Sequence, residues 1–286
     1  MAFKIITDTG CDFPASMYEE LGLHVVPLAV LYKEQTFTEY TDQWLKEMYD
    51  GLRVGEKAST SAINPVGWQT AMEQYLSQGL DVLVLAFSSG LSTTYQSAVI
   101  AAEELREKYP DRKIRVVDTL CASLGEGLLV WYAAKKQQEG QDVDQVADWA
   151  ENNKLNLCHY FTPDDLMHLK RGGRVSAATA VAGTLLQIKP VLHVDNEGHL
   201  ISIGKARGRK AALKALCDAM GDLALPGENE TVFISHGDCL EDAQYLAEMI
   251  KQKHGTKEVF ISYIGAVIGA HAGPGTIALF FLGDHR

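Results

Sequence analysis

The first half of the chain repeats short apolar runs that are followed by longer segments of helical composition. Residues 81–87 form a continuous apolar run of strand length, which is typical of a parallel strand covered on both faces. Because further strands and helices alternate around it, this half is expected to form a right-handed βα sheet. The pattern predicts strands at 3–7 and 113–117, an apolar run at 24–32, and helices at 14–21, 41–49, 66–76, 98–108, 122–138 and 142–153.

The pattern changes near residues 155–161, and we place a domain boundary there. The expected domains are residues 1–157, an N-terminal α/β domain with hydroxyl-rich loops, and residues 158–286, a C-terminal α/β domain. The fold class is therefore expected to be α/β throughout. The second half predicts a hairpin of 189–194 with 199–203, strands at 231–235, 259–263 and 277–282, and helices at 163–169, 204–220 and 241–253.

The turn after the 81–87 run carries more hydroxyl groups than a helix start requires. Five serines and threonines lie between Phe87 and Tyr95, whereas one hydroxyl is enough to cap a helix. The open end of such a turn offers amides and hydroxyls to an anion, which makes Ser92 a candidate ligand. Ordinary capping is the alternative interpretation.

A second hydroxyl cluster, residues 59–61, lies in a predicted loop before the helix at 66–76. Asn64, followed by a proline at the first helical position, explains the start of that helix without these hydroxyls. In a parallel sheet this loop and the Ser92 turn would lie at the same carboxyl edge, where such sheets bind ligands. The two clusters together predict an anion site.

Composition limits the classes of partner and compartment. The formal net charge of −11 disfavours nucleic acid or an anionic membrane surface as a general partner. The five cysteines are far apart and form no Cys-x-x-Cys pair, which argues against a zinc site or a disulfide framework and for a reducing compartment. No apolar run is long enough to span a membrane, and the N-terminus has no signal-peptide pattern. We expect a cytoplasmic protein without stable membrane insertion.

Several charged residues have two interpretations. Asp8 and Asp12 follow the first strand and could hold Mg²⁺, although capping of the local backbone is favoured. The stretch Lys-Arg-Gly-Gly-Arg at 170–174 is either a helix end or a docking surface. Four cations at 205–210 oppose the dipole of the helix expected there, so one of them, Arg207, is expected to face inward. His271 lies in a glycine-rich segment and is either a structural group or a ligand contact.

Seven stretches together resemble the DegV family of bacterial fatty-acid-binding proteins, which includes the FakB subunits of fatty acid kinases. They span nearly the whole chain in the family order, and the ordered set is specific although each piece is weak. The stretches are Ile6-Thr7-Asp8-Thr9, Ser59-Thr60-Ser61, Ser88-Ser89-Gly90-Leu91-Ser92, Lys170-Arg171-Gly172-Gly173-Arg174, Ile188-Lys189-Pro190, Lys205-Ala206-Arg207 and His271-Ala272-Gly273-Pro274-Gly275.

The resemblance implies two α/β domains, the second with a mixed sheet, and a fatty acid held between them. Its carboxylate ligands would be Thr60 and Ser92, with Ser61 beside them, and Arg207 and His271 would lie near the carboxylate. The chain would be a monomeric carrier without catalytic residues, metal or cofactor. It would present the acid to a separate ATP-dependent kinase, which makes an acyl phosphate for phospholipid synthesis.

Two departures from the family pattern affect the detail of the head-group site. Thr93 stands where a glycine is common, and Ala272 stands where a hydroxyl residue is common. Candidate residues for lining the tail cavity are those at 180–186 together with Phe280 and Phe281, although each is also a plain core residue by pattern.

Two other functions stay open at this point. An enzyme acting on a phosphorylated or carboxylated metabolite would use the same anion site, with Asp8, Asp118 or His271 as acid or base. The sequence offers neither metal-ligand spacing nor a nucleophile beside a base. A regulatory sensor whose lipid changes its affinity for a partner is the third possibility.

Overall fold

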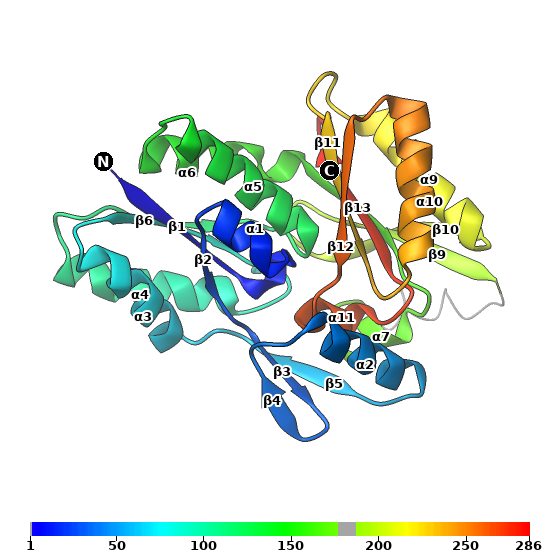
Figure 1. Ribbon diagram of the computed structural model, residues 1–286, viewed down its shortest axis with the longest axis horizontal. Coiled ribbons are helices and arrows are strands. Elements are labelled where there is room, and N and C mark those ends of the chain that lie inside the picture. The colour runs from blue at the N-terminus through cyan, green and yellow to red at the C-terminus, as the bar shows by residue number, and fades with distance from the viewer. Residues whose placement is uncertain (1, 177–186) are drawn as a thin grey trace.

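The computed structural model describes residues 2–176 and 187–286, and these form an α/β structure with two larger sheets and a small third one (Figure 1). The first sheet has the strand order β2-β1-β6-β7, and all of its pairs are parallel. Its strands are β1 (Phe3–Asp8), β2 (His24–Val26), β6 (Asp81–Ala86) and β7 (Ile114–Asp118). Every residue of β6 is buried, as its continuous apolar run predicts.

The helices of the first half fall where the sequence places them. Asn64 caps α3, because its side chain accepts a hydrogen bond from the Gly67 amide, and Pro65 occupies the first helical position. The helices are α1 (Ala15–Glu20), α2 (Asp42–Arg53), α3 (Pro65–Leu76), α4 (Thr94–Lys108), α5 (Leu124–Gln138) and α6 (Val143–Asn153), with 3-10 turns η1 (Thr9–Cys11) and η2 (Lys154–Asn156).

A small antiparallel sheet of order β4-β3-β5 differs from the sequence-based expectation. The apolar run at 24–32 is divided into β2 and β3 (Ala29–Tyr32), because Pro27 has no amide to continue the first ladder. The predicted loop containing 59–61 is in fact β5 (Ala58–Ser61), paired with β3, and β4 (Gln35–Phe37) pairs with the other edge of β3. The hydroxyl cluster therefore lies on a strand.

The second sheet is mixed, with the order β10-β9-β8-β13-β11-β12. The predicted hairpin is confirmed as β9 (Ile188–Val194) and β10 (Leu200–Arg207). However, β10 runs through Arg207 and helix α9 begins only at Arg209, so the segment from 204 to 207 is strand and not helix. The other elements are β8 (Leu157–Thr162), β11 (Thr231–His236), β12 (Glu258–Tyr263), β13 (Ile277–Leu282), α7 (Met167–Arg171), α9 (Arg209–Leu223), α10 (Leu240–His254) and α11 (Ala266–Ala272).

Helix α5 lies between the two larger sheets. It contacts β8, β11 and β13 of the second sheet, and its Leu128 belongs to one buried cluster with Leu85 of the first sheet and Phe280 of the second. The helix is apolar on nearly all sides, as a helix enclosed by other layers must be. The boundary between residues 157 and 158 stays a prediction, and β8 begins there. Within the described ranges, no helix is long and apolar enough to cross a membrane.

Candidate functional site

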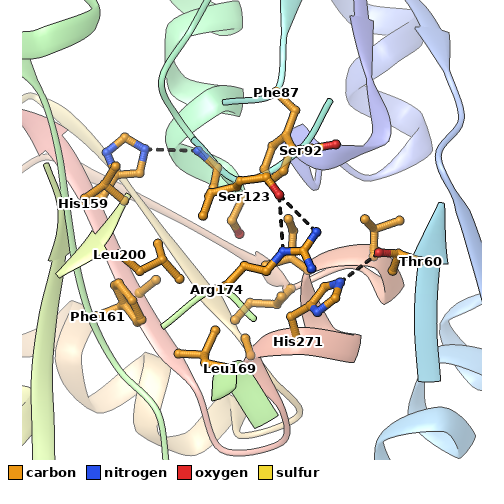
Figure 2. Close-up of a pocket in the computed structure, with 18 of the residues that line it drawn as sticks. Thr60, Phe87, Ser92, Ser123, His159, Phe161, Leu169, Arg174, Leu200 and His271 are labelled. Carbon is orange, nitrogen blue, oxygen red and sulfur yellow. Dashed lines mark hydrogen bonds between the residues drawn. The ribbon is translucent and has the colours of Figure 1, made fainter. Parts of the chain in front are cut away.

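A cavity of about 460 Å³ lies where the first sheet, the second sheet and α11 meet. Figure 2 shows its two ends: Thr60, Ser92, Arg174 and His271 on one side, and His159, Phe161 and Leu200 on the other. The volume is in the range of about 300 to 1,000 Å³ that is usual for small-molecule sites. The cavity is thus polar at one end and mainly apolar at the other.

Strand alternation brings Thr60 to the polar end. On β5 the side chains of Ser59 and Ser61 are exposed, whereas Thr60 points to the opposite face. Helix α11 packs against β5, and there the Thr60 hydroxyl and His271 Nε2 share a hydrogen bond of 2.8 Å. These two residues are 211 positions apart in sequence, and the fold makes them neighbours.

Ser92 lies in the turn between β6 and α4 and also lines the cavity. Its hydroxyl oxygen accepts a hydrogen bond from the Thr94 amide at 3.2 Å and shares another with the Thr94 hydroxyl at 2.8 Å. Ser92 precedes the N-cap residue Thr93, and its hydroxyl satisfies the amide of Thr94, the first residue of α4. Ser92 is half-buried and forms part of the cavity wall. Capping and ligand contact are compatible here.

Arg174 supplies the positive charge of this site. Its Nε and Nη2 groups donate hydrogen bonds to the Leu91 carbonyl at 3.2 and 3.1 Å, and Nη1 donates to the Gly172 carbonyl. Partial burial lowers the pKa of the guanidinium, which nevertheless stays charged at neutral pH. Among the residues the structure describes, no carboxylate forms an ion pair with Arg174. The cation is thus available to an anionic ligand.

The two glycines before Arg174 explain the local chain path. Gly173 has φ +72°, a conformation that other residues rarely adopt. A Cβ on Gly172 would lie 2.2 Å from His271 Nδ1, so a side chain cannot fit there. The Lys-Arg-Gly-Gly-Arg stretch ends α7 and then directs its last arginine into the cavity. The structure thus adds a cavity-lining position for Arg174 to the two interpretations taken from sequence.

Burial and the nearby Arg174 cation lower the pKa of His271 from 6.5 to about 4, so the imidazole is neutral at pH 7. The unfolded chain takes up a proton near pH 6.5, whereas the folded protein does so only near pH 4. His271 therefore stabilises the folded state fully above pH 6.5, and this contribution is lost as the pH falls toward 4.

We expect this linkage to appear when wild type is compared with His271→Gln in urea unfolding at pH 7 and pH 4.5. The wild type should lose about 2 to 3 kcal/mol relative to the variant at the lower pH, because each pKa unit corresponds to about 1.36 kcal/mol. An unchanged difference between the two proteins would show that His271 titrates normally in the folded state.

Two residues implied by the family resemblance do not line this cavity. Ser61 is exposed on the other face of β5. Arg207 is exposed at the end of β10, so the inward orientation expected for it is wrong. The expectation assumed a helix start at this position, where the dipole would oppose the charge, but the strand continues there and leaves the side chain in solvent.

Asp8 and Asp12 are both buried. Asp8 caps η1, as the capping interpretation predicts, whereas Asp12 accepts a hydrogen bond from a serine that is distant in sequence. Asp8 accepts hydrogen bonds from the Gly10 and Phe87 amides at 2.8 and 2.9 Å, and Asp12 accepts one from Ser123 Oγ at 2.5 Å. Desolvation raises the pKa of Asp8 to about 7 and that of Asp12 to about 8. No group of three potential metal ligands is found in the described part of the chain.

The apolar end is built from strands of the second sheet and the hairpin. Phe280 lines it from β13, whereas Phe281 points to the other face and packs in a separate cluster, because adjacent strand residues alternate. Phe161 and Leu200 add further apolar wall. The predicted lining segment at 180–186 lies outside the described residues.

Sequence reasoning missed several polar residues of the wall, among them Ser123, His159, Arg174 and Thr276. Arg174 was visible only as part of a cationic turn, and nothing local indicated its direction. His159 belongs to a strand that reads as plain core, and its burial at 2% exposure next to the cavity emerges only from the fold.

Comparisons with known proteins agree over the whole chain. A family model described as "Uncharacterised protein, DegV family" matches residues 2–284. A DegV domain-containing protein of Clostridium perfringens is 48% identical over 99% of this chain and 98% of its own length.

Two solved structures share the fold and carry a description of their ligand. A DegV family protein from Thermus thermophilus, described by its fatty acid binding, has a TM-score of 0.89 and 32% identity, covering 99% of this chain and 100% of that one. DegV of Bacillus subtilis, described as a fatty acid binding protein, has a TM-score of 0.83 and 28% identity, covering 99% and 100%.

Proposed function

Because this chain belongs to the DegV family, we propose that it binds a long-chain fatty acid in the cavity between its sheets. The observation that carries the proposal is the division of one cavity into an apolar end and a polar end, where Arg174 forms no ion pair with a described carboxylate. A fatty acid has the same division along its length. The carboxylate would contact Thr60, Ser92, Arg174 and His271, and the tail would extend toward Phe161 and Phe280.

The free energy of fatty acid binding depends on both the polar and the apolar end of the cavity. A carboxylate is ionised at neutral pH and is costly to bury unless hydroxyls and a cation replace its water. Each buried methylene contributes roughly 0.8 kcal/mol, so a tail of about fifteen contributes about 12 kcal/mol. Association costs roughly 4 to 15 kcal/mol, and tight binding therefore requires nearly complete enclosure of the tail.

Titration with palmitate and with its methyl ester tests this arrangement. The ester keeps the tail and loses the charge, so we expect it to bind at least about tenfold more weakly, which corresponds to 1.4 kcal/mol. Equal affinity for the two compounds would contradict a role for the polar end, and no binding of either would contradict the proposal as a whole.

Thr60→Val is expected to weaken palmitate binding by about tenfold or more. Valine has nearly the same shape, so the change removes the hydroxyl, which shares a hydrogen bond with His271 Nε2 and would also donate one to the charged carboxylate, the latter worth about 1.5 to 3 kcal/mol. Ser61→Ala, on the opposite face of the same strand, is the matched control and should bind palmitate normally. The same titration measures both variants, and similar losses in both would indicate damage to β5 instead of loss of a ligand contact.

The family resemblance extends the proposal to a carrier that presents its fatty acid to a separate kinase. In this form the chain acts in the cytoplasm as a monomer, uses ATP only through its partner, and requires no cofactor. Arg207 is exposed and does not line the cavity, which suits a contact with a partner protein.

Reconstitution with the kinase of the same organism tests the carrier role. Acyl phosphate should form only when both proteins, ATP and fatty acid are present. Arg207→Ala should retain palmitate and slow acyl phosphate formation. Normal turnover with this variant would make Arg207 a surface cation, and acyl phosphate formed by either protein alone would contradict the division of labour.

The alternative, an enzyme using the same anion site, receives less support. Both carboxylate oxygens of Asp8 accept backbone amides, and Asp118 Oδ1 accepts the amides of Ser89 and Leu120. These carboxylates are occupied by structural hydrogen bonds and are poorly placed to act as general bases.

A further inference from the structure

Arg286 is a buried cation, 8% exposed, whose guanidinium donates to three separate segments of the chain, at 121, at 154–157 and at 195. Nε donates to the Leu157 carbonyl at 3.1 Å and Nη1 to the Asp195 carbonyl at 2.8 Å. Nη2 donates to the Lys154 carbonyl at 2.7 Å and to Cys121 Sγ at 3.2 Å. No ion pair joins Arg286 to a carboxylate within the described ranges. A buried guanidinium is costly unless its donors are used, so these acceptors and the arginine fix one another.

The acceptors of Arg286 lie next to the apolar end of the cavity. Three of them are close in sequence to residues that line it: Cys121 precedes Ala122, Asp195 follows Val194, and Leu157 lies two positions before His159. Figure 2 shows His159 on the side of the cavity away from Thr60 and His271. Arg286 is therefore tied to the wall where a bound tail would end.

The contact with His159 is mediated by a shared carbonyl. The Leu157 oxygen accepts a hydrogen bond from Arg286 Nε and lies 2.8 Å from His159 Nδ1, which donates to it. His159 Nε2 is then the acceptor for the Ala122 amide at 3.4 Å, and the ring stands edge-on to Phe280 with centroids 5.3 Å apart. Arg286 thus orients the His159 ring and strand β8 at the apolar end of the cavity.

The turn between β9 and β10 is held from two sides. Arg286 binds it at Asp195, and on the other side the Ser88 hydroxyl donates to the Gly198 carbonyl at 3.0 Å. Val194 and Leu200 flank this turn and line the cavity. Loss of Arg286 would remove its hydrogen bond to the turn, while the Ser88 bond and the close approach of Leu120 to Gly198 remain.

We infer that Arg286 is a positioning residue that fixes the apolar wall and thereby sets the affinity for long acyl tails. This inference rests on the proposed fatty acid binding. If the apolar wall is free to move, it encloses the methylenes farthest from the carboxylate poorly. A short acyl tail does not reach this wall and is therefore unaffected. Removal of Arg286 should therefore weaken long acids selectively and leave the polar end unchanged.

The experiment compares dissociation constants for decanoate and palmitate in wild type, Arg286→Ala and Arg286→Lys. We expect Arg286→Ala to bind palmitate about tenfold more weakly, the equivalent of roughly two buried methylenes, with decanoate changed less than about twofold. Arg286→Lys keeps the cation but loses the planar fork, so a smaller loss in the same direction is expected. If Arg286→Ala does not fold, Arg286→Lys alone tests the inference by the same comparison of decanoate with palmitate.

Arg106→Ala is the matched control, because Arg106 also donates to a backbone carbonyl, that of Ile114, at 2.7 Å but away from the cavity. It should leave the ratio of the two dissociation constants unchanged. Equal weakening of decanoate and palmitate in the Arg286 variants, or no weakening, would overturn the inference while fatty acid binding stands. Failure of the wild type to bind either acid would overturn the proposed function as well.

Discussion

Arg174→Ala is expected to weaken palmitate binding by about 10- to 150-fold. Arg174 is the one permanently charged cation among the described residues that line the cavity, and it forms no ion pair with a described carboxylate. A hydrogen bond to a charged group contributes about 1.5 to 3 kcal/mol, and leaving a buried carboxylate unpaired adds to the loss. Isothermal titration of the delipidated protein with palmitate measures the effect.

Two variants make the Arg174 result specific. Arg207→Ala removes an exposed arginine and should bind palmitate like the wild type. Arg174→Lys keeps the charge but not the fork that donates to Leu91, so its affinity should lie between those of wild type and Arg174→Ala. Unchanged affinity in Arg174→Ala would remove this residue from the carboxylate site.

Ala122→Trp is expected to have the largest effect, a loss of about 1,000-fold in palmitate affinity. Ala122 lines the cavity two residues before the start of α5, and an indole there would occupy space needed by the tail. Displacing roughly five methylenes corresponds to about 4 kcal/mol. Titration with palmitate and with decanoate measures the loss, which should be smaller for the shorter acid.

Ala122→Ser is the matched control, since it changes polarity with little added volume. It should bind palmitate within a few-fold of the wild type. Thermal unfolding of both variants separates a filled cavity from a damaged core, because overpacking can also destabilise the protein by about 1 to 3 kcal/mol. A well-folded Ala122→Trp protein with full palmitate affinity would mean that the tail lies elsewhere.

Much of the fold follows from periodicity alone. The 81–87 run predicts a central buried strand, and β6 is buried along its whole length. The sequence-based assignment of strands and loops is wrong where a single residue or a tertiary contact determines the secondary structure. Pro27 divides the run at 24–32, and pairing with β3 turns the 59–61 loop into a strand, which no local pattern indicates.

The candidate site shows the same division between local and tertiary information. The structure brings Thr60, Ser92 and His271 to one end of one cavity, but places Ser61 on the opposite face of its strand. Arg207 and Arg174 both lie in cationic stretches of the sequence. Sequence alone favours Arg207 as the inward cation, whereas in the structure Arg174 lines the cavity and Arg207 is exposed. The difference depends on where β10 ends and on the Gly172-Gly173 turn, both of which are set by packing.

Mass spectrometry of the purified protein, first native and then denatured, tests fatty acid binding most directly. A mass difference equal to one long-chain fatty acid per chain, lost on denaturation and recovered by organic extraction, is the expected result, and it would also name the preferred chain length. A protein that is purified empty and takes up neither palmitate nor oleate would contradict the proposed function.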